Sequence, residues 1–233
     1  MATAVQQFAN GTFTPDGHIY KNAAGKEIPS VTQILENLGF IDLSEVSPQR
    51  LEHKRRIGDA VHYYVHLVLQ GIEVDWDKVH DDAANYCWAF DKFLAESNFV
   101  PDLIEGKPAT EIVGVHKHHG MEYGYTYDLR GKIGGFPVLI DIKNTYAIEP
   151  SWPYQLAAYE LTLPKPENEP YWRRLALWLR KDSRYELLPN GRKKEDVGDR
   201  KHDSEVFTWC LAVAWEQVNR GCFKKQKPAE ETL

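Results

Sequence analysis

The clearest hydrophobic pattern in the chain predicts two adjacent β-strands. Residues 125–133, YTYDLRGKI, alternate between aromatic or aliphatic side chains and polar ones, which is typical of a strand. Residues 136–143, FPVLIDIK, are mostly apolar and include β-branched side chains, which favours a second strand. Gly134 and Gly135 separate the two runs and suit a tight turn. We therefore expect a β-hairpin over residues 125–143.

A different spacing, with apolar residues three or four positions apart, predicts helices elsewhere in the chain. The longest such segment runs from about Pro48 to Gln70. Ser30 and Ser151 are expected to cap two shorter helices, because a serine hydroxyl accepts hydrogen bonds from the free amides of a first turn. The predicted helices span residues 30–38, 48–70, 77–97, a segment that starts at 151, and 202–220.

Shorter runs complete the predicted fold. Strands are expected at residues 109–116, 172–179 and 184–188, and turn residues between 8 and 29 predict a small N-terminal hairpin. Strands interleaved with helices favour an α/β fold, with a mixed central sheet flanked by helices. The length of 233 residues suits one large domain, and no segment has the composition of a dividing linker.

Composition narrows the class of protein. The chain has no run of about 18 apolar residues, so no membrane span is expected. Its N-terminus lacks the basic and apolar regions of a secretory signal. The cysteines, Cys87, Cys210 and Cys222, are odd in number and far apart, which favours reduced thiols in a cytosolic protein.

The charge of the chain is unevenly distributed. The formal net charge is −6. Residues 1–170 hold 14 Lys and Arg against 24 Asp and Glu, a balance of −10, whereas residues 171–233 hold 14 against 10, a balance of +4. This distribution suits a protein that gathers acids for a metal and basic groups for phosphate. Charge alone, however, favours ordinary solvated faces.

The candidate chemistry lies in the expected hairpin, which would bring Asp128 and Asp141 close together. Two adjacent carboxylates repel unless a cation lies between them, and a hard divalent cation with oxygen ligands meets that need. Asp141 and Lys143 are two residues apart and therefore leave the same face of a strand. A metal-binding carboxylate beside an ammonium group suits phosphodiester hydrolysis.

These residues resemble the core of the PD-(D/E)XK nuclease superfamily. The match consists of Asp128, then Asp141-Ile142-Lys143, and it extends over about residues 55–160. The segment from Gln155 to Tyr159 resembles the Q-x-x-x-Y motif of the RecB-like and Cas4-like branch. The resemblance implies a restriction-endonuclease-like core and a single nuclease domain over residues 1–233. That domain would combine an N-terminal β-hairpin and helical part (about 1–100) with a catalytic core (about 105–220).

Other residues extend the resemblance. The segment from Gly58 to His62 resembles a G-x-x-x-H helix element whose histidine is able to bind a metal, and imidazole suits Mn²⁺ better than Mg²⁺. Glycine inside a helix costs about 1 kcal/mol relative to alanine, so we expect a close approach at Gly58. Arg55 and Arg56 are expected to contact DNA phosphates, with a solvated helix face as the alternative.

Glu111 opens the core, where the family's glutamate supports the metal or orients a lysine; an exposed edge carboxylate is the alternative. His116, His118 and His119 lack the further ligands of a tetrahedral zinc site, so a structural or solvent-facing role is expected. Some Cas4-like nucleases hold an iron–sulfur cluster on four cysteines. The three scattered cysteines of this chain do not match that pattern, so no cluster is expected.

The resemblance implies a metal-dependent DNA nuclease, in particular an exonuclease of recombination, repair or phage DNA processing. Asp128 and Asp141 would bind Mg²⁺ or Mn²⁺ with the Ile142 carbonyl, and His62 would complete the site or hold a second metal. Lys143 would position or deprotonate water, or stabilise developing charge. The supporting groups would be Glu111, Gln155 and Tyr159, and the last two would also contact DNA.

The implied partners are single- or double-stranded DNA and a recombination or single-strand-binding protein, with no membrane. The implied location is the cytoplasm of a bacterial or phage-infected cell. Two alternatives stay open at this point. One is a structure-specific endonuclease on the same core, and the other is a non-catalytic DNA-binding module.

Overall fold

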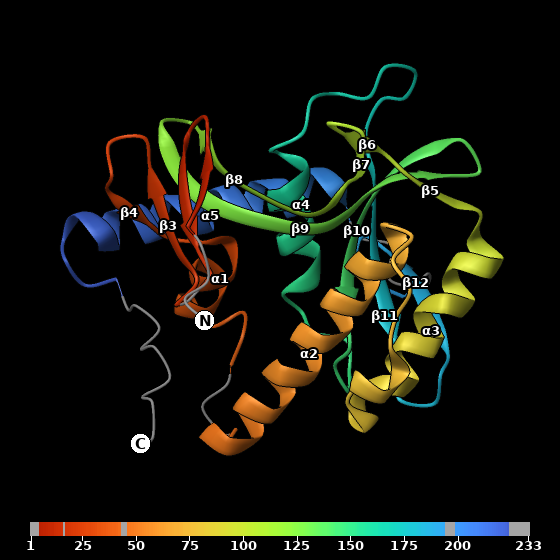
Figure 1. Cartoon of the computed structure of the whole chain (residues 1–233). Helices are drawn as coiled ribbons and strands as arrows, with labels where there is room; N and C mark the ends of the chain where they lie inside the picture. Colours follow the sequence, from red (N-terminus) through yellow and green to blue (C-terminus); the bar gives the residue numbers. More distant parts are fainter. Residues whose placement is uncertain (1–4, 16, 43–45, 194–198, 224–233) are drawn as a thin grey trace.

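A six-stranded mixed sheet organises the fold (Figure 1). The computed structural model describes residues 5–15, 17–42, 46–193 and 199–223. The strand order is β12-β11-β10-β9-β5, and β8 pairs with β9 as well. The strands are β5 (Phe99–Pro101), β8 (Thr110–His118), β9 (Met121–Ile133), β10 (Phe136–Lys143), β11 (Arg173–Leu179) and β12 (Tyr185–Pro189).

The expected hairpin forms the centre of this sheet. Strands β9 and β10 pair antiparallel, with Phe136 opposite Ile133. Gly134 and Gly135 make the turn with positive φ angles of 57° and 85°, which glycine adopts without steric cost. After β10 the chain crosses over through helix α4 (Trp152–Glu160) and returns as β11, parallel to β10. The sheet is therefore mixed, as predicted.

Helices cover both faces of the sheet. On one face α2 (Pro48–Leu69) and α3 (Asp81–Ser97) pack on apolar residues of β10 and β11, among them Ile140 and Leu177. On the other face α4 and α5 (Arg200–Asn219) pack on residues such as Leu139 and Ala176. Alternate residues of β10 thus enter different cores, because successive strand side chains point to opposite faces. The α/β class with a mixed sheet flanked by helices is confirmed.

A second sheet stands beside the first. Its strands are β1 (Gln6–Phe8), β2 (Gly11–Thr14), β3 (Ile19–Asn22) and β4 (Glu27–Ile28), in that order. The sequence predicted only a small hairpin here. The sheet packs on β8 and β9 through a small core that contains Phe13, Tyr20 and Val115. Figure 1 shows these strands opposite α2, with β8 and β9 running behind the space between them.

The remaining helix boundaries agree with those predicted from the sequence, with two exceptions. Ser30 caps α1 (Val31–Asn37) as predicted, in a reciprocal arrangement with Gln33. The predicted helix over 77–97 is interrupted: a short 3₁₀ turn, η1 (Trp76–Lys78), precedes α3. Ser151 occupies the N-cap position of α4 but makes no capping hydrogen bond. The two-stranded ribbon of β6 (Leu103–Ile104) and β7 (Lys107–Pro108) completes the described elements.

Within residues 5–15, 17–42, 46–193 and 199–223, no helix is both long enough and apolar enough to span a membrane.

Two glycines give a test of this packing. A Cβ at Gly124 would lie 2.1 Å from Cγ of buried Tyr20, so Gly124→Ala should lower the free energy of unfolding by about 1–3 kcal/mol. A Cβ at Gly58 would lie 3.9 Å from the Asn144 amide, an ordinary contact, so no described residue of the protein makes the expected close approach at Gly58. Gly58→Ala should therefore stabilise the protein by up to about 1 kcal/mol. Urea denaturation curves measure both changes, and equal effects would contradict this packing.

Candidate functional site

Three acidic residues form a row across neighbouring strands. Leu129 of β9 pairs with Thr110 of β8 on one side and with Ile140 of β10 on the other. Paired residues of antiparallel strands have Cβ atoms about 4.5–5.5 Å apart, so this pairing brings the adjoining residues of the three strands into one neighbourhood. One residue further along, the three strands carry Glu111, Asp128 and Asp141.

The sheet opens at this row. Backbone pairing between β9 and β10 ends at Leu129 and Ile140. Beyond that point the amide of Ile142 donates a 2.5 Å hydrogen bond to Oδ2 of Asp128, so a carboxylate side chain serves as the acceptor. Asp128 and Asp141 are both buried, at 6% and 3% exposure. The hairpin thus places both aspartates at one opening in the sheet, where both line the same cleft.

Glu111 has an unusual backbone conformation. Its φ angle is +52°, in the left-handed region that costs a non-glycine residue about 1–2 kcal/mol. Its side chain reaches out to helix α2, where Oε1 lies 2.7 Å from Nδ1 of His62. Strain of this kind persists only where the surrounding structure holds it, and it is frequent at functional sites.

Helix α2 contacts the row through His62 and the neighbouring residue Thr110 through His66. Nδ1 of His62 lies 2.7 Å from Glu111 and 3.4 Å from Oδ1 of Asp128. His66, one turn later on the same helix face, has its Nδ1 2.7 Å from the hydroxyl of Thr110. These two contacts fix α2 across β8. The role of His66 was missed from the sequence, although its spacing of four from His62 is a usable signal.

Electrostatics at the row reflect crowded negative charge. Burial raises the pKa of Asp128 far above its ordinary value, His62 opposes that shift, and Asp141 and Glu111 add to it. Burial lowers the pKa of His62, but the carboxylates of Asp128 and Glu111 outweigh burial and raise it to about 10. The imidazole therefore carries a proton at neutral pH and partly balances the acids.

The same groups are suited to hold a cation. One ligand atom each from His62, Glu111 and Asp128 lie within 4.8 Å of one another. Oδ2 of Asp141 is buried and has no hydrogen-bond partner among the described residues. Two or three carboxylates with one imidazole form a ligand set that suits Mn²⁺, and carboxylates alone suit Mg²⁺.

Lys143 is held between the row and helix α4. Its Nζ lies 2.6 Å from Oδ2 of Asp141, an ion pair without hydrogen-bond alignment, and donates a 2.7 Å hydrogen bond to Oε1 of Gln155. Gln155 in turn donates to the hydroxyl of Tyr159 at 2.8 Å. Gln155 and Tyr159 share a helix face as predicted, and both are buried. In this arrangement they orient the ammonium group of Lys143.

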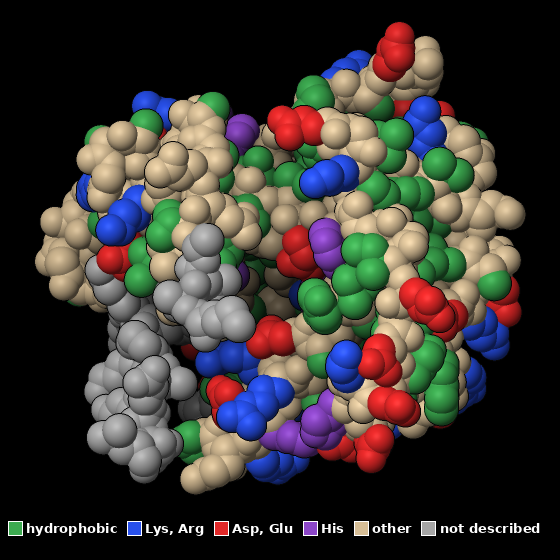
Figure 2. All heavy atoms as spheres, in the orientation of Figure 1, with side chains coloured by type: hydrophobic (Ala, Val, Ile, Leu, Met, Phe, Trp, Pro, Cys, Tyr) green, Lys and Arg blue, Asp and Glu red, His purple; other side chains and the backbone are tan. Residues whose placement is uncertain are grey.

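These groups line a cleft of about 900 Å³. Figure 2 shows the molecule hollowed between the N-terminal strands and α2, with acidic and histidine side chains gathered there. Arg55 lines the cleft, whereas Arg56 pairs with Glu52 at 3.0 Å and does not line it. Lys54 lines it as well and was missed from the sequence. Its spacing of eight from His62, on the same helix face, is the signal that identifies it.

The histidines near the end of β8 lie outside the cleft. The ring centroids of His116 and His118 lie 6.4 Å apart, and Nε2 of His118 lies 3.1 Å from the Thr208 hydroxyl. Neither histidine lines the cleft. Burial lowers the pKa of both histidines. Their contacts agree with the structural role expected for them. Ile142 lines the cleft, and ligation by its carbonyl stays a prediction.

Comparisons with known proteins add little. No family model matches the sequence, and no curated protein is significantly similar to it. Among solved structures, one described as "Crystal structure of SSO0001" is 12% identical, over 78% of this chain and 82% of that chain, with a TM-score of 0.32. A likeness of this degree carries no argument about fold or function.

The pKa of His62 gives a prediction for the metal-free protein. Its folded value of about 10 lies above the value of about 6.5 expected in the unfolded chain. The stability that protonated His62 contributes is therefore fully present below pH 6.5 and is lost as pH rises toward 10. Between pH 6.5 and 8.5, His62 should lower the unfolding free energy by up to about 1.4 kcal/mol per pH unit, and the raised pKa of Asp128 acts in the same direction.

Denaturation in EDTA at several pH values measures this slope. His62→Gln should flatten it, whereas the matched variant of an exposed histidine, His119→Gln, should keep it. Equal slopes in wild type and His62→Gln would contradict the assigned charge state of His62.

Proposed function

We propose that this protein is a metal-dependent DNA nuclease that hydrolyses phosphodiester bonds, most simply an exonuclease. The observation that carries the proposal is the carboxylate row of Glu111, Asp128 and Asp141, which lies in an open cleft beside an oriented lysine. Hydrolysis of a phosphodiester needs a metal site, a positioned water and a cation for the developing negative charge. The cleft contains groups suited to each need.

The acidic row and His62 would hold Mg²⁺ or Mn²⁺, and the Ile142 carbonyl would add a ligand. Once bound, such an ion lowers the pKa of water and offsets charge on the phosphate. The buried Oδ2 of Asp141, which has an ion pair with Lys143 but no hydrogen bond among the described residues, and the raised pKa of Asp128 support the assignment, because a cation would stabilise both carboxylates. His62 would have to release its proton before it could act as a ligand.

Lys143 would supply the positive charge that hydrolysis needs in addition to the metal. Its ammonium is fixed by Asp141 and Gln155, so it needs no reorganisation when charge develops on the phosphate. It would stabilise that charge or position the attacking water. Gln155 and Tyr159 would act through Lys143, because in this structure their polar atoms bond to it and to each other.

A restriction-endonuclease-like core of the RecB-like type is part of this proposal. The mixed sheet with its central hairpin, the position of D-x-K at the end of β10 and Q-x-x-x-Y on α4 support it. The proposal extends to a single nuclease domain over residues 1–233, and to a role in recombination, repair or phage DNA processing in the cytoplasm. A recombination or single-strand-binding protein would be a partner there.

The first test is cleavage by variants of the two central residues. Asp141→Ala and Lys143→Ala should each reduce cleavage of linear DNA at least about 100-fold in Mg²⁺ or Mn²⁺, because one removes a metal ligand and the other the positioned cation. The matched control is Asp77→Asn, an exposed acid on η1, which should cleave at the wild-type rate. Full activity in Asp141→Ala would refute the mechanism.

Substrate topology separates the alternatives in the same assay. An exonuclease leaves covalently closed circles intact, whereas a structure-specific endonuclease cuts them. A non-catalytic DNA-binding module would bind DNA but cleave neither form in either metal.

The second test measures the metal itself. Mn²⁺ at 100 times its dissociation constant should raise the unfolding free energy of the wild-type protein by about 2.7 kcal/mol. Asp128→Asn and Asp141→Asn should lose most of this increase, since each removes a carboxylate of the row. Thermal unfolding with and without Mn²⁺ gives the shift, with Asp77→Asn as the control. A wild-type protein that is insensitive to Mn²⁺ would exclude the metal site.

A further inference from the structure

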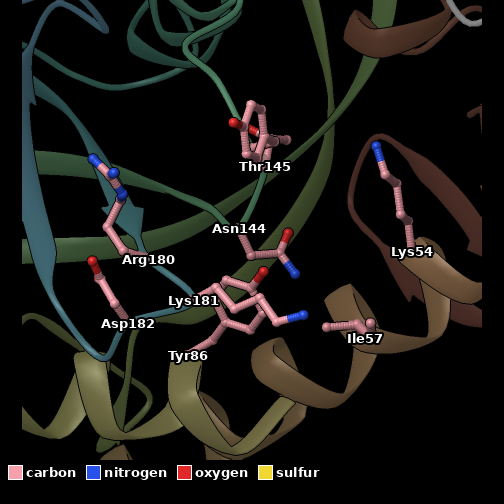
Figure 3. Close-up of a pocket in the computed structure, with 9 residues that line it drawn as sticks. Lys54, Ile57, Tyr86, Asn144, Thr145, Arg180, Lys181 and Asp182 are labelled. Atoms are coloured by element: carbon pink, nitrogen blue, oxygen red, sulfur yellow. The ribbon is translucent and has the colours of Figure 1, made fainter. Parts of the chain in front are cut away.

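A second pocket of about 550 Å³ opens beside the cleft (Figure 3). The two cavities share Lys54 of α2 and the pair Asn144 and Thr145, which directly follow Lys143. Figure 3 shows the pocket walls coming from α2, α3, the residues after β10 and the turn after β11. A substrate bound over the carboxylate row would therefore enter this second pocket as it extends past the end of β10.

The pocket presents two lysines for which the described residues provide no ion-pair partner. Arg180 is occupied, because its guanidinium pairs with Glu186 at 2.8 Å and lies 4.1 Å from the ring of Trp178. Asp182 is likewise paired, with Arg184. Lys54 and Lys181, by contrast, are exposed and have no ion pair within the part of the chain that the structure describes. Two uncompensated ammonium groups favour an anionic ligand.

An unpacked aromatic ring stands at the same pocket. Tyr146 is 96% exposed, and it lies three residues after Lys143. The loop that carries it is anchored, because the indole of Trp178 donates a 2.8 Å hydrogen bond to the carbonyl of Thr145. The hydroxyl of Thr145 also donates to the carbonyl of Ala147 at 2.7 Å. The backbone on either side of Tyr146 is therefore fixed while its ring stays free to stack.

The volume of the pocket and its side chains indicate which class of ligand it fits. A cavity of 550 Å³ falls within the range of about 300–1,000 Å³ for sites that enclose small molecules, which suits a nucleotide rather than a duplex. Exposed aromatic rings stack on unpaired bases, and lysines beside them follow the phosphate backbone. In a duplex only the two terminal base pairs expose a face, whereas every base of a single strand can unstack, so Tyr146 finds a free face far more often on unpaired bases.

We propose that this pocket binds an unpaired nucleotide next to the phosphodiester that is cleaved. Its base stacks on Tyr146, and the phosphates on either side of it contact Lys54 and Lys181. This inference rests on the proposed nuclease function and deepens it, because it identifies single-stranded DNA, or a frayed end, as the substrate. The shared residues Asn144 and Thr145 place this nucleotide immediately beside the catalytic groups.

Binding of fluorescent oligonucleotides tests the pocket without any need for cleavage. In EDTA, the wild-type protein should bind a single strand more tightly than a blunt duplex of the same length. Tyr146→Ala should weaken single-strand binding by about 5- to 100-fold, as expected for the loss of one stacked base. The control Tyr63→Ala removes another exposed ring, 64% exposed on α2, and should have no effect.

The lysines are tested through salt dependence. On single strands, each phosphate contact contributes about 0.7 to the slope of log affinity against log salt. Lys54→Gln with Lys181→Gln should reduce that slope by about 1.4. The control Lys117→Gln, an exposed lysine on β8 outside both cavities, should leave it unchanged.

An abasic site moved along the oligonucleotide identifies the stacked position. One position should weaken wild-type binding and leave Tyr146→Ala unaffected, because the base and the ring act as a pair. Tyr146→Trp should bind the single strand more tightly than Tyr146→Ala, at about the wild-type affinity. Equal binding by Tyr146→Ala and Tyr63→Ala, or tighter binding of the blunt duplex, would overturn the inference.

The outcomes for the two proposals are distinguishable. Binding that depends on Tyr146, in a protein that cleaves no DNA in Mg²⁺ or Mn²⁺, would support the pocket and refute the nuclease. Cleavage that is unchanged by all three pocket substitutions would support the nuclease and refute the pocket.

Discussion

Repulsion within a row of three carboxylates is the constraint to which the rest of the site responds. Glu111, Asp128 and Asp141 each come directly after or before a paired residue of adjacent strands and line one cleft, so their charges act on one another. Two of them are buried, so water screens them poorly. Each acid therefore has a compensating group. His62 serves Glu111 and Asp128, the Ile142 amide serves Asp128, and Lys143 serves Asp141.

The compensating groups are held by helices on opposite faces of the sheet and by β10 itself, which carries Ile142 and Lys143. Helix α2 packs on one face and carries His62, whereas α4 packs on the other and holds Lys143 through Gln155. An intact sheet would separate the two. The opening at Asp128, where β9 leaves β10, removes that barrier and lets groups from both faces meet at one cleft. The interruption in backbone pairing is thus a condition for the site.

Several features of this cleft oppose folding. Glu111 has a left-handed backbone, an oxygen of Asp141 has no hydrogen bond, and the pKa of Asp128 is raised by burial. A core selected only for stability would replace such groups with apolar side chains. Local violations of this kind mark functional sites, where stability is given up for chemistry. The neighbouring pocket also has an exposed aromatic ring, Tyr146, and two lysines without an ion pair among the described residues.

Local sequence determined the elements and the chemistry within each of them. Alternation and two glycines specify the hairpin, a spacing of two places Asp141 and Lys143 on one face, and a spacing of four joins Gln155 to Tyr159. These properties need no distant partner, because backbone geometry alone sets which side chains share a face. Tertiary structure decided the rest. Contact between His62 and Glu111, 49 residues apart, and the joining of Lys54 with Lys181 in one pocket depend on how helices dock on strands. Docking depends on the summed packing of many side chains, which periodicity in a short window does not encode.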